Sequence, residues 1–140
     1  MKQKDFYNSL AWKYCSRYIL LYYADENYVV QCSTSGKYYQ LPDKRIHAGH
    51  YIPIHQFKAI AFEFKNILPQ SYQDNKFYSG KPEIMAKKID KIHGQGTVEM
   101  LNIKKHNICK LGKFEMDYFA KYYKQKFEEL VKIKGNPWKK

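Results

Sequence analysis

The amino-acid sequence predicts an α+β fold, in which a β-rich middle section is flanked by one helix on its N-terminal side and by further helices on its C-terminal side. Apolar residues recur at spacings near 3.6 over residues 8–23 and 114–133, as in helices that pack one face on a core. Residues 28–53 instead carry short runs of β-branched and aromatic residues separated by turn formers. The 140 residues, 44% of them hydrophobic, are enough for one packed domain.

The first helix is expected over residues 8–23, because Asn8 or Ser9 is a suitable N-cap and the polar run at residues 24–27 ends the periodicity. A turn is expected at residues 33–36. Short strands are expected on either side of that turn and beyond it, over residues 28–32, 37–41 and 46–53.

The second half of the chain carries weaker strand signals and stronger helix signals. The alternation Phe62-Glu63-Phe64 indicates a strand that runs into Asn66, and the polar residues 69–75 are expected to be irregular. Helices are expected from Pro82, a favourable first-turn residue, to about Ile92, and then over residues 97–101 and 114–133.

The balance of charge is strongly basic. Lysine and arginine total 25 and aspartate and glutamate total 13, so the formal net charge is +12. This excess predicts a polyanionic partner, and basic residues mixed with 14 tyrosines fit nucleic acid better than lipid. We expect no membrane partner and a cytoplasmic location, because no window is apolar enough to span a bilayer and residues 1–6 lack the apolar region of a signal peptide.

The cysteines are few and widely spaced. Cys15, Cys32 and Cys109 form no CxxC pair, so neither a disulfide framework nor a zinc site made of cysteines alone is expected. Cys15 and Cys109 are expected to be small core residues.

Four side chains suited to phosphodiester hydrolysis fall in the middle of the chain: His47, His50, Asn66 and Asn75. The reaction needs a base that activates water and a divalent cation that neutralises charge on the phosphate. An imidazole has a pKa near working pH, an asparagine can hold the imidazole or the backbone beside it, and an amide oxygen can bind Mg²⁺ or Mn²⁺. Taken singly, each residue also has a structural interpretation, such as a histidine bonded to a backbone carbonyl or an asparagine in a turn.

An ordered series of short motifs between residues 9 and 101 is more specific than any one of these side chains. It consists of AWKYCSRYI at 11–19, VQCSTSGK at 30–37, HAGHYIP at 47–53, FKNILPQ at 64–70, Asn75, Ser79-Gly80, His93-Gly94 and VEML at 98–101. In this order the series resembles the NinG/Rap family of phage recombination nucleases. The resemblance implies a small ββα-metal (His-Me finger, HNH-like) core. It also implies a nuclease domain at residues 1–105 and a basic C-terminal helical arm at residues 106–140.

The resemblance assigns roles by position: general base to His50, orienting residue to Asn66, and ligand of Mg²⁺ or Mn²⁺ to Asn75. Many HNH sites have a metal ligand directly before the base, where this chain has Gly49. His47 is the candidate that replaces it, and His93 is a further candidate to approach the site.

The family pattern also has two CxxC pairs that hold a structural zinc, and here this sequence departs from it. Cys32 matches the first cysteine, but its partner position is Ser35, and the second pair falls on Ser71 and Asp74. Because serine is a weak zinc ligand, we expect structural zinc to be absent. Aromatic packing, or a bond such as one from Ser35 to Asp74, is expected to join the two loops instead.

The resemblance therefore implies a metal-dependent endonuclease that cuts branched DNA, such as Holliday junctions or D-loops, during phage recombination or replication in the host cytoplasm. Cutting two strands at a junction favours a homodimer. The basic residues expected to contact DNA are Arg17, Lys37, Lys44, Arg45, Lys81, Lys87 and Lys88. Two alternatives remain open: a catalytically inactive protein that binds branched DNA, which the missing zinc ligands favour, and an RNA-binding module, which the abundance of lysine and tyrosine favours.

Overall fold

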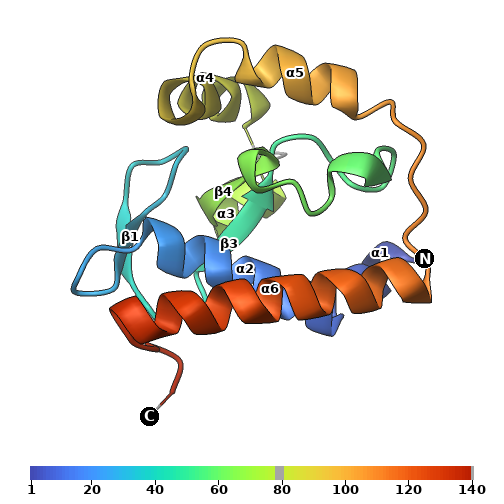
Figure 1. Ribbon diagram of the computed structural model, residues 1–140. Coiled ribbons are helices and arrows are strands. Elements are labelled where there is room, and N and C mark those ends of the chain that lie inside the picture. The colour runs from blue at the N-terminus through green and yellow to red at the C-terminus, as the bar shows by residue number, and fades with distance from the viewer. Residues whose placement is uncertain (78–80, 140) are drawn as a thin grey trace.

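The computed structural model describes residues 1–77 and 81–139, and within them it combines α-helices with two small antiparallel sheets (Figure 1). The helices are α1 (Gln3–Tyr7), α2 (Leu10–Tyr23), α3 (Tyr72–Phe77), α4 (Pro82–His93), α5 (Thr97–Lys104) and α6 (Lys113–Lys134). The strands are β1 (Val29–Gln31), β2 (Tyr38–Gln40), β3 (Ile46–His50) and β4 (Ile67–Ser71), with the 3-10 turns η1 (Lys58–Ile60) and η2 (Phe64–Asn66) between β3 and β4. The predicted α+β class is confirmed.

The first helix and the hairpin after it form where the sequence predicts them. Helix α2 begins after Ser9, whose hydroxyl accepts a hydrogen bond from the backbone N–H of Trp12 at 3.1 Å. Strands β1 and β2 pair antiparallel, with Val30 opposite Tyr39. The strand expected over residues 46–53 is β3 and ends earlier, at His50.

Two predictions for the middle of the chain are wrong. Residues Phe62-Glu63-Phe64 form no strand, because the chain turns in η2, where the backbone N–H of Asn66 donates to the carbonyl of Glu63 at 3.0 Å. The run at 69–75 is not irregular, because β4 and α3 span it. Every residue of β4 is buried, so pairing with β3 supplies partners for backbone groups that a buried loop would leave unsatisfied.

Helix α1 is an element that the sequence pattern does not predict. Its five residues are too few for a recognisable period or for stability on their own. Phe6 holds it in place, since this side chain is 2% exposed and its ring packs 5.4 Å from Trp12 and 5.1 Å from Phe62. Tertiary packing, rather than local propensity, therefore places α1 over the molecule.

Strands β3 and β4 and helix α3 form a ββα unit in chain order. Ile46 pairs with Ser71 at one end of the hairpin and His50 pairs with Ile67 at the other. Gly49 lets the strands pair with Gln70 in its present position, because a Cβ atom at residue 49 would lie 2.5 Å from the side-chain oxygen of Gln70 and force it to shift.

The core lies between two helical layers. Helix α6 runs along α2, and α4 and α5 form a separate layer above the ββα unit (Figure 1). The segment predicted as an arm, residues 106–140, contributes Met116 and Tyr123 to the same buried cluster as Trp12 and Cys15. Cys15 is a core residue as predicted, whereas Cys109 is exposed, so that expectation is wrong.

The end of α6 is fastened to the end of α2 by one ammonium group. The Nζ atom of Lys134 donates to the carbonyl oxygens of Leu21, Tyr22 and Ala24 at 2.8, 3.0 and 2.8 Å. These carbonyls lie at the C-terminal end of α2, where the helix dipole is negative and the last carbonyls lack their usual helical partners, although Leu21 also accepts from the N–H of Ala24. Lys134 thus caps a helix that lies 110 residues or more before it in the chain.

Candidate active site and nucleic-acid groove

An open groove of about 980 Å³ lies between α1, α2, β3 and α3. Four cationic side chains line it: Lys4, Lys13, Arg17 and Lys76. Four aromatic side chains line it as well: Tyr7, Trp12, Tyr72 and Trp138. Among the described residues that line the groove, none carries a carboxylate. A groove lined by cations, with no carboxylate among its described lining residues, attracts anions.

His50 is the last residue of β3, and its hydrogen bonds define which ring nitrogen carries the proton. Its Nε2 atom lies 2.8 Å from the carbonyl oxygen of Ala61. A carbonyl can only accept, so Nε2 carries the proton and Nδ1 keeps its lone pair. Nδ1 faces the hydroxyl of Tyr7 at 3.4 Å, and Tyr7 lines the groove. The basic nitrogen of His50 therefore faces a residue of the groove lining, while His50 itself is not among the residues that line the groove.

The ring of His50 is packed among aromatic side chains. It stacks on Trp12 with ring centroids 4.8 Å apart, and Phe6 and Tyr7 lie within 6.2 Å. This burial lowers the pKa of His50 to about 4, and the bond to Ala61 opposes the shift only in part. At neutral pH the imidazole is uncharged, which is the state that can accept a proton, but helix α1 covers it.

Asn66 is fully buried and organises the loop next to His50. Its Oδ1 accepts from the backbone N–H of Ile52 at 2.8 Å, and its Nδ2 donates to the carbonyls of Ile52 and Ile60 at 3.1 and 3.3 Å. These bonds join both ends of the segment between His50 and Ala61. Asn66 therefore holds the backbone beside the imidazole, which is one of the two roles that the sequence predicts for an asparagine here. Within the described part of the chain, its side chain makes no hydrogen bond to the His50 ring.

His47 and Asn75 both line the groove, where they could offer one imidazole and one amide oxygen to a cation. The Nε2 atom of His47 already lies 3.0 Å from the carbonyl of Lys44, and its ring meets the ring of Tyr72 edge-on. In the part of the chain that the structure describes, no three His, Cys, Asp or Glu side chains are grouped to hold a metal ion. These donors fit a cation that is shared with phosphate oxygens and water, and they do not fit a resident ion held by the protein alone.

His93 lies elsewhere. Its Nε2 atom is 3.4 Å from the hydroxyl of Tyr23, and its ring packs edge-on against Phe64 at 5.8 Å. Neither partner lines the groove. His93 therefore does not join the predicted site.

The degenerate zinc positions form a hydrogen-bonded cluster in which Cys32, Ser71 and Asp74 are buried and Ser35 is exposed. The thiol of Cys32 accepts from the backbone N–H groups of Ser35 and Ser71 at 3.4 and 3.2 Å, and Thr34 donates to Asp74 at 2.5 Å. Burial alone would raise the pKa of Cys32, but hydrogen bonds from Ser35, Thr34 and the backbone lower it to about 7. The two loops are joined, as expected, by a hydrogen bond to Asp74, but its donor is Thr34 and not Ser35.

Of the basic residues expected to contact DNA, only Arg17 lines the groove, with its guanidinium 5.3 Å from the ring of Trp138. The other predicted contacts lie outside it: Lys37, Lys44, Arg45, Lys81, Lys87 and Lys88. Arg45 is paired with Asp43, and Lys81 with Asp74. Sequence reasoning missed Lys4, Lys13 and Lys76. The spacing of four between Lys13 and Arg17 puts both on one face of α2 and was a usable signal.

Comparison with protein-family models, with curated proteins and with solved structures finds no match to this chain. The motif Ser79-Gly80 lies outside the described residues. Within residues 1–77 and 81–139, no helix has both the length and the apolar character that a membrane span requires.

Proposed function

We propose that the protein is a divalent-metal-dependent endonuclease that acts on branched DNA, such as Holliday junctions or D-loops, in phage recombination or replication. The observation that carries this proposal is the proton arrangement of His50. Its Nε2 proton is donated to the carbonyl of Ala61, and its Nδ1 lone pair faces Tyr7, a side chain that separates it from a groove rich in cations. A general base for water needs this tautomer and this direction.

The hydroxyl of Tyr7 marks the place of the nucleophile. It lies 3.4 Å from Nδ1 of His50, where a water molecule would give up its proton as it attacks phosphorus. The reaction therefore requires α1 to move and Tyr7 to leave, and exposure to water returns the pKa of His50 towards its ordinary value of about 6.5. Lys13, Arg17 and Lys76 hold the phosphodiester backbone without reading bases.

A bound divalent cation would neutralise negative charge on the phosphate. Asn75 and His47 are the groove residues that would hold it, together with oxygens of the DNA. Cleavage of both strands of a junction would bring two copies of the chain together as a homodimer.

A second candidate function is a catalytically inactive protein that binds branched DNA. The observation that favours it is the covered state of His50, with a pKa of about 4 beneath α1 and a groove that offers no carboxylate among its described lining residues. If the protein is inactive, the groove binds phosphates and the role of His50 is structural, through its stacking on Trp12.

A nicking assay on a four-way junction with Mg²⁺ or Mn²⁺ separates the two candidates. We expect cleavage by the natural chain and background cleavage by His50→Gln, with junction affinity unchanged within about twofold because binding rests on the groove cations. His55→Gln is the matched control, since His55 is exposed and does not line the groove. Equal background cleavage by all three proteins, with binding retained, would support the inactive candidate. Stronger binding to RNA than to the junction would instead favour an RNA-binding module.

A further inference from the structure

A second aromatic surface lies away from the groove. We call it the tyrosine face, and it consists of Tyr18, Tyr22, Phe64, Tyr118 and Tyr122. Tyr22, Tyr118 and Tyr122 are 48%, 56% and 42% exposed, which is high for rings of this size. A large exposed apolar patch on a protein surface commonly marks a binding site.

The rings of the tyrosine face form one connected surface across three elements. Tyr22 meets Phe64 edge-on at 4.9 Å and lies 6.1 Å from Tyr18. On α6, Tyr118 and Tyr122 lie one helical turn apart, with centroids 6.2 Å apart and planes inclined by only 21°. The buried ring of Tyr123 joins the two halves.

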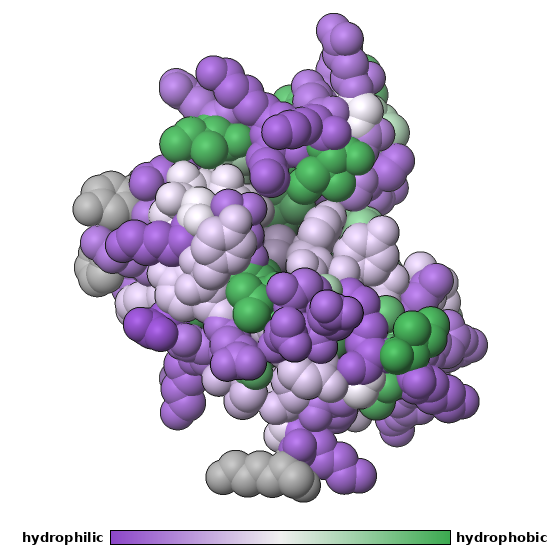
Figure 2. All heavy atoms as spheres, turned by 90° about the vertical axis from the view of Figure 1, so that its left-hand side faces the viewer, coloured by the Kyte–Doolittle hydropathy of each residue, from purple (hydrophilic) through white to green (hydrophobic). Residues whose placement is uncertain are grey.

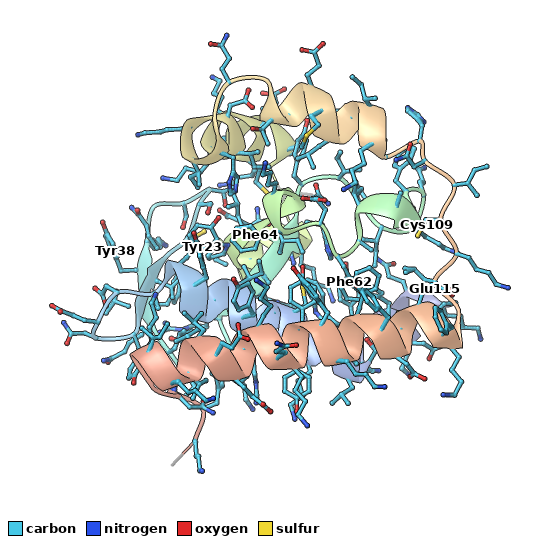
Figure 3. All side chains as sticks on the ribbon, in the orientation of Figure 1. Tyr23, Tyr38, Phe62, Phe64, Cys109 and Glu115 are labelled. Atoms are coloured by element: carbon cyan, nitrogen blue, oxygen red, sulfur yellow. The ribbon has the colours of Figure 1, made fainter. Side chains whose placement is uncertain are left out.

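The core holds this surface in place. Tyr123 packs 6.0 Å from Tyr18 and 5.0 Å from Tyr122, and its hydroxyl donates to the carbonyl of Phe62. Behind the face, Tyr23 stacks on Phe64 with planes 9° apart (Figure 3). Rings that are already ordered lose little freedom when a ligand stacks on them.

The tyrosine face and the groove lie on opposite sides of α2. Ser16 and Leu20 line the groove, and Tyr18 and Tyr22 follow each of them by two residues, which is about 200° around the helix. Figure 2, viewed from the left of Figure 1, shows the surface hollowed between the α4–α5 layer and the layer below it. A ligand on the tyrosine face therefore leaves the groove free.

Cations flank the tyrosine face. The Nζ atom of Lys126 lies 5.8 Å from the ring of Tyr122, and Lys121 stands three residues after Tyr118 on the same helix. Lys65 follows Phe64 directly. Carboxylates also lie near this surface: the pKa of Tyr18 is raised by burial first, then by Tyr22 and Tyr122, and last by the charge of Glu129.

We propose that the tyrosine face binds unpaired nucleotides of single-stranded DNA, with bases stacked on Tyr22, Tyr118 and Tyr122 and phosphates beside the flanking lysines. Stacking of bases on aromatic rings beside cations tolerates any sequence, because every base has a π face. A second copy of this chain is disfavoured as the occupant, since a two-fold contact through this face would set the flanking lysines of the two copies against each other. The inference extends the proposed function by giving the unpaired strand of a branched substrate a place of its own.

Fluorescence anisotropy with a labelled oligothymidylate of about 16 nucleotides, near the upper site size of single-strand-binding domains, tests this proposal. We expect the double variant Tyr118→Leu/Tyr122→Leu to bind about tenfold more weakly and Tyr118→Phe/Tyr122→Phe to bind within about twofold of the natural chain, because stacking needs the ring and not the hydroxyl. Tyr38→Leu is the matched control, since Tyr38 is 68% exposed on β2, away from the face (Figure 3).

Failure of this binding proposal can be told apart from failure of the proposed nuclease function. His50→Gln keeps its affinity for the oligothymidylate, so loss of nuclease activity leaves the proposal standing. The proposal is overturned if the leucine pair binds as well as the natural chain, or if the phenylalanine pair loses as much affinity as the leucine pair. It is also overturned if sedimentation shows that the leucine pair dissociates an oligomer, since the face would then join copies of the chain.

Discussion

The imidazole of His50 and the carbonyl of Ala61 are joined by a hydrogen bond of 2.8 Å, which ties the end of β3 to a loop eleven residues further along. This bond needs only one of the two ring protons of an imidazolium. The second proton, on Nδ1, would face Tyr7 within an aromatic enclosure. The structure around His50 is therefore built for the neutral ring, and its stability must depend on pH.

Acid is expected to destabilise the protein through His50. Because burial lowers the pKa of His50 from 6.5 to about 4, the unfolded chain takes up the proton first as the pH falls. The stabilising contribution is complete above about pH 6.5 and is lost between about pH 6.5 and 4, by at most about 3 kcal/mol. Urea unfolding at about pH 7 and pH 4.5 measures this loss. His50→Gln should show a smaller difference between the two pH values, and an equal difference would contradict the assignment.

Removing the Tyr7 side chain, which covers Nδ1 of His50, is expected to make His50 a more effective base. Tyr7→Ala opens Nδ1 to water, so the pKa of His50 should rise and junction cleavage should increase several-fold. Tyr7→Phe keeps the ring packed and serves as the control with a small effect. The histidine titration followed by NMR gives the pKa independently of activity. A fall in both the pKa and the cleavage rate in Tyr7→Ala would show that Tyr7 assists the base instead of covering it.

The hydrogen bond from Thr34 to Asp74 is expected to stabilise the joined loops. Thr34→Val leaves a buried carboxylate oxygen without its donor, which costs about 1–3 kcal/mol of unfolding free energy. A double-mutant cycle with Asp74→Asn measures the coupling, which should exceed about 0.5 kcal/mol. Ser33→Ala, in the same turn, is the control and should lie within about 0.5 kcal/mol of the natural chain. Additive effects of the two substitutions would refute a direct coupling.

The ammonium group of Lys134 is expected to stabilise the packing of α6 on α2. Lys134→Met keeps most of the aliphatic stem but removes the ammonium donor from the carbonyls of Tyr22 and Ala24 and leaves Leu21 with the N–H of Ala24 alone, for a loss of about 1–3 kcal/mol. Lys132→Met, on the same turn of α6 and exposed, removes the same charge and should change stability by less than about 0.5 kcal/mol. Equal losses in the two variants would assign the effect to net charge.

Removal of groove cations is expected to weaken DNA binding uniformly across sequences. Each of Lys13→Gln and Lys76→Gln should reduce the slope of log affinity against log salt by about 1, because one phosphate contact is lost. Lys124→Gln, on the exposed part of α6 and beside Glu128, is the control. Anisotropy titrations of a junction at several salt concentrations give these slopes. Unchanged slopes in the groove variants would place the DNA elsewhere.

Secondary-structure elements that depend on neighbouring residues, such as a helix with its own N-cap and apolar period, could be predicted from the sequence. The N-cap at Ser9 and the apolar period of α2 are local, so the start and end of this helix follow from the residues themselves. Strand β4 and helix α3 could not be read in this way. Gln70, Ser71 and Asp74 are polar yet buried, and their contacts come from residues more than 30 positions earlier in the chain.

The candidate site was predicted in part. His47 and Asn75 line one groove, whereas His50 lies behind Tyr7, which lines that groove and faces Nδ1. The cover by Tyr7 could not be foreseen, because α1 is short and depends on the packing of Phe6. Asn66 acts on the backbone of Ile52 and not on the imidazole, a choice that depends on loop geometry and leaves no trace in residue spacing.

Gly49 and Gln70 share a single volume in the β3–β4 hairpin, since a Cβ atom on the first would meet the side-chain oxygen of the second. A side chain at position 49 would therefore require Gln70 to shift. An aspartate directly before His50 would place a carboxylate beside the imidazole, and it is accommodated best by a paired exchange such as Gly49→Asp with Gln70→Ala, which removes the side chain that would have to shift. Descendants of this chain that acquire a carboxylate there are expected to carry a small residue on the opposite strand.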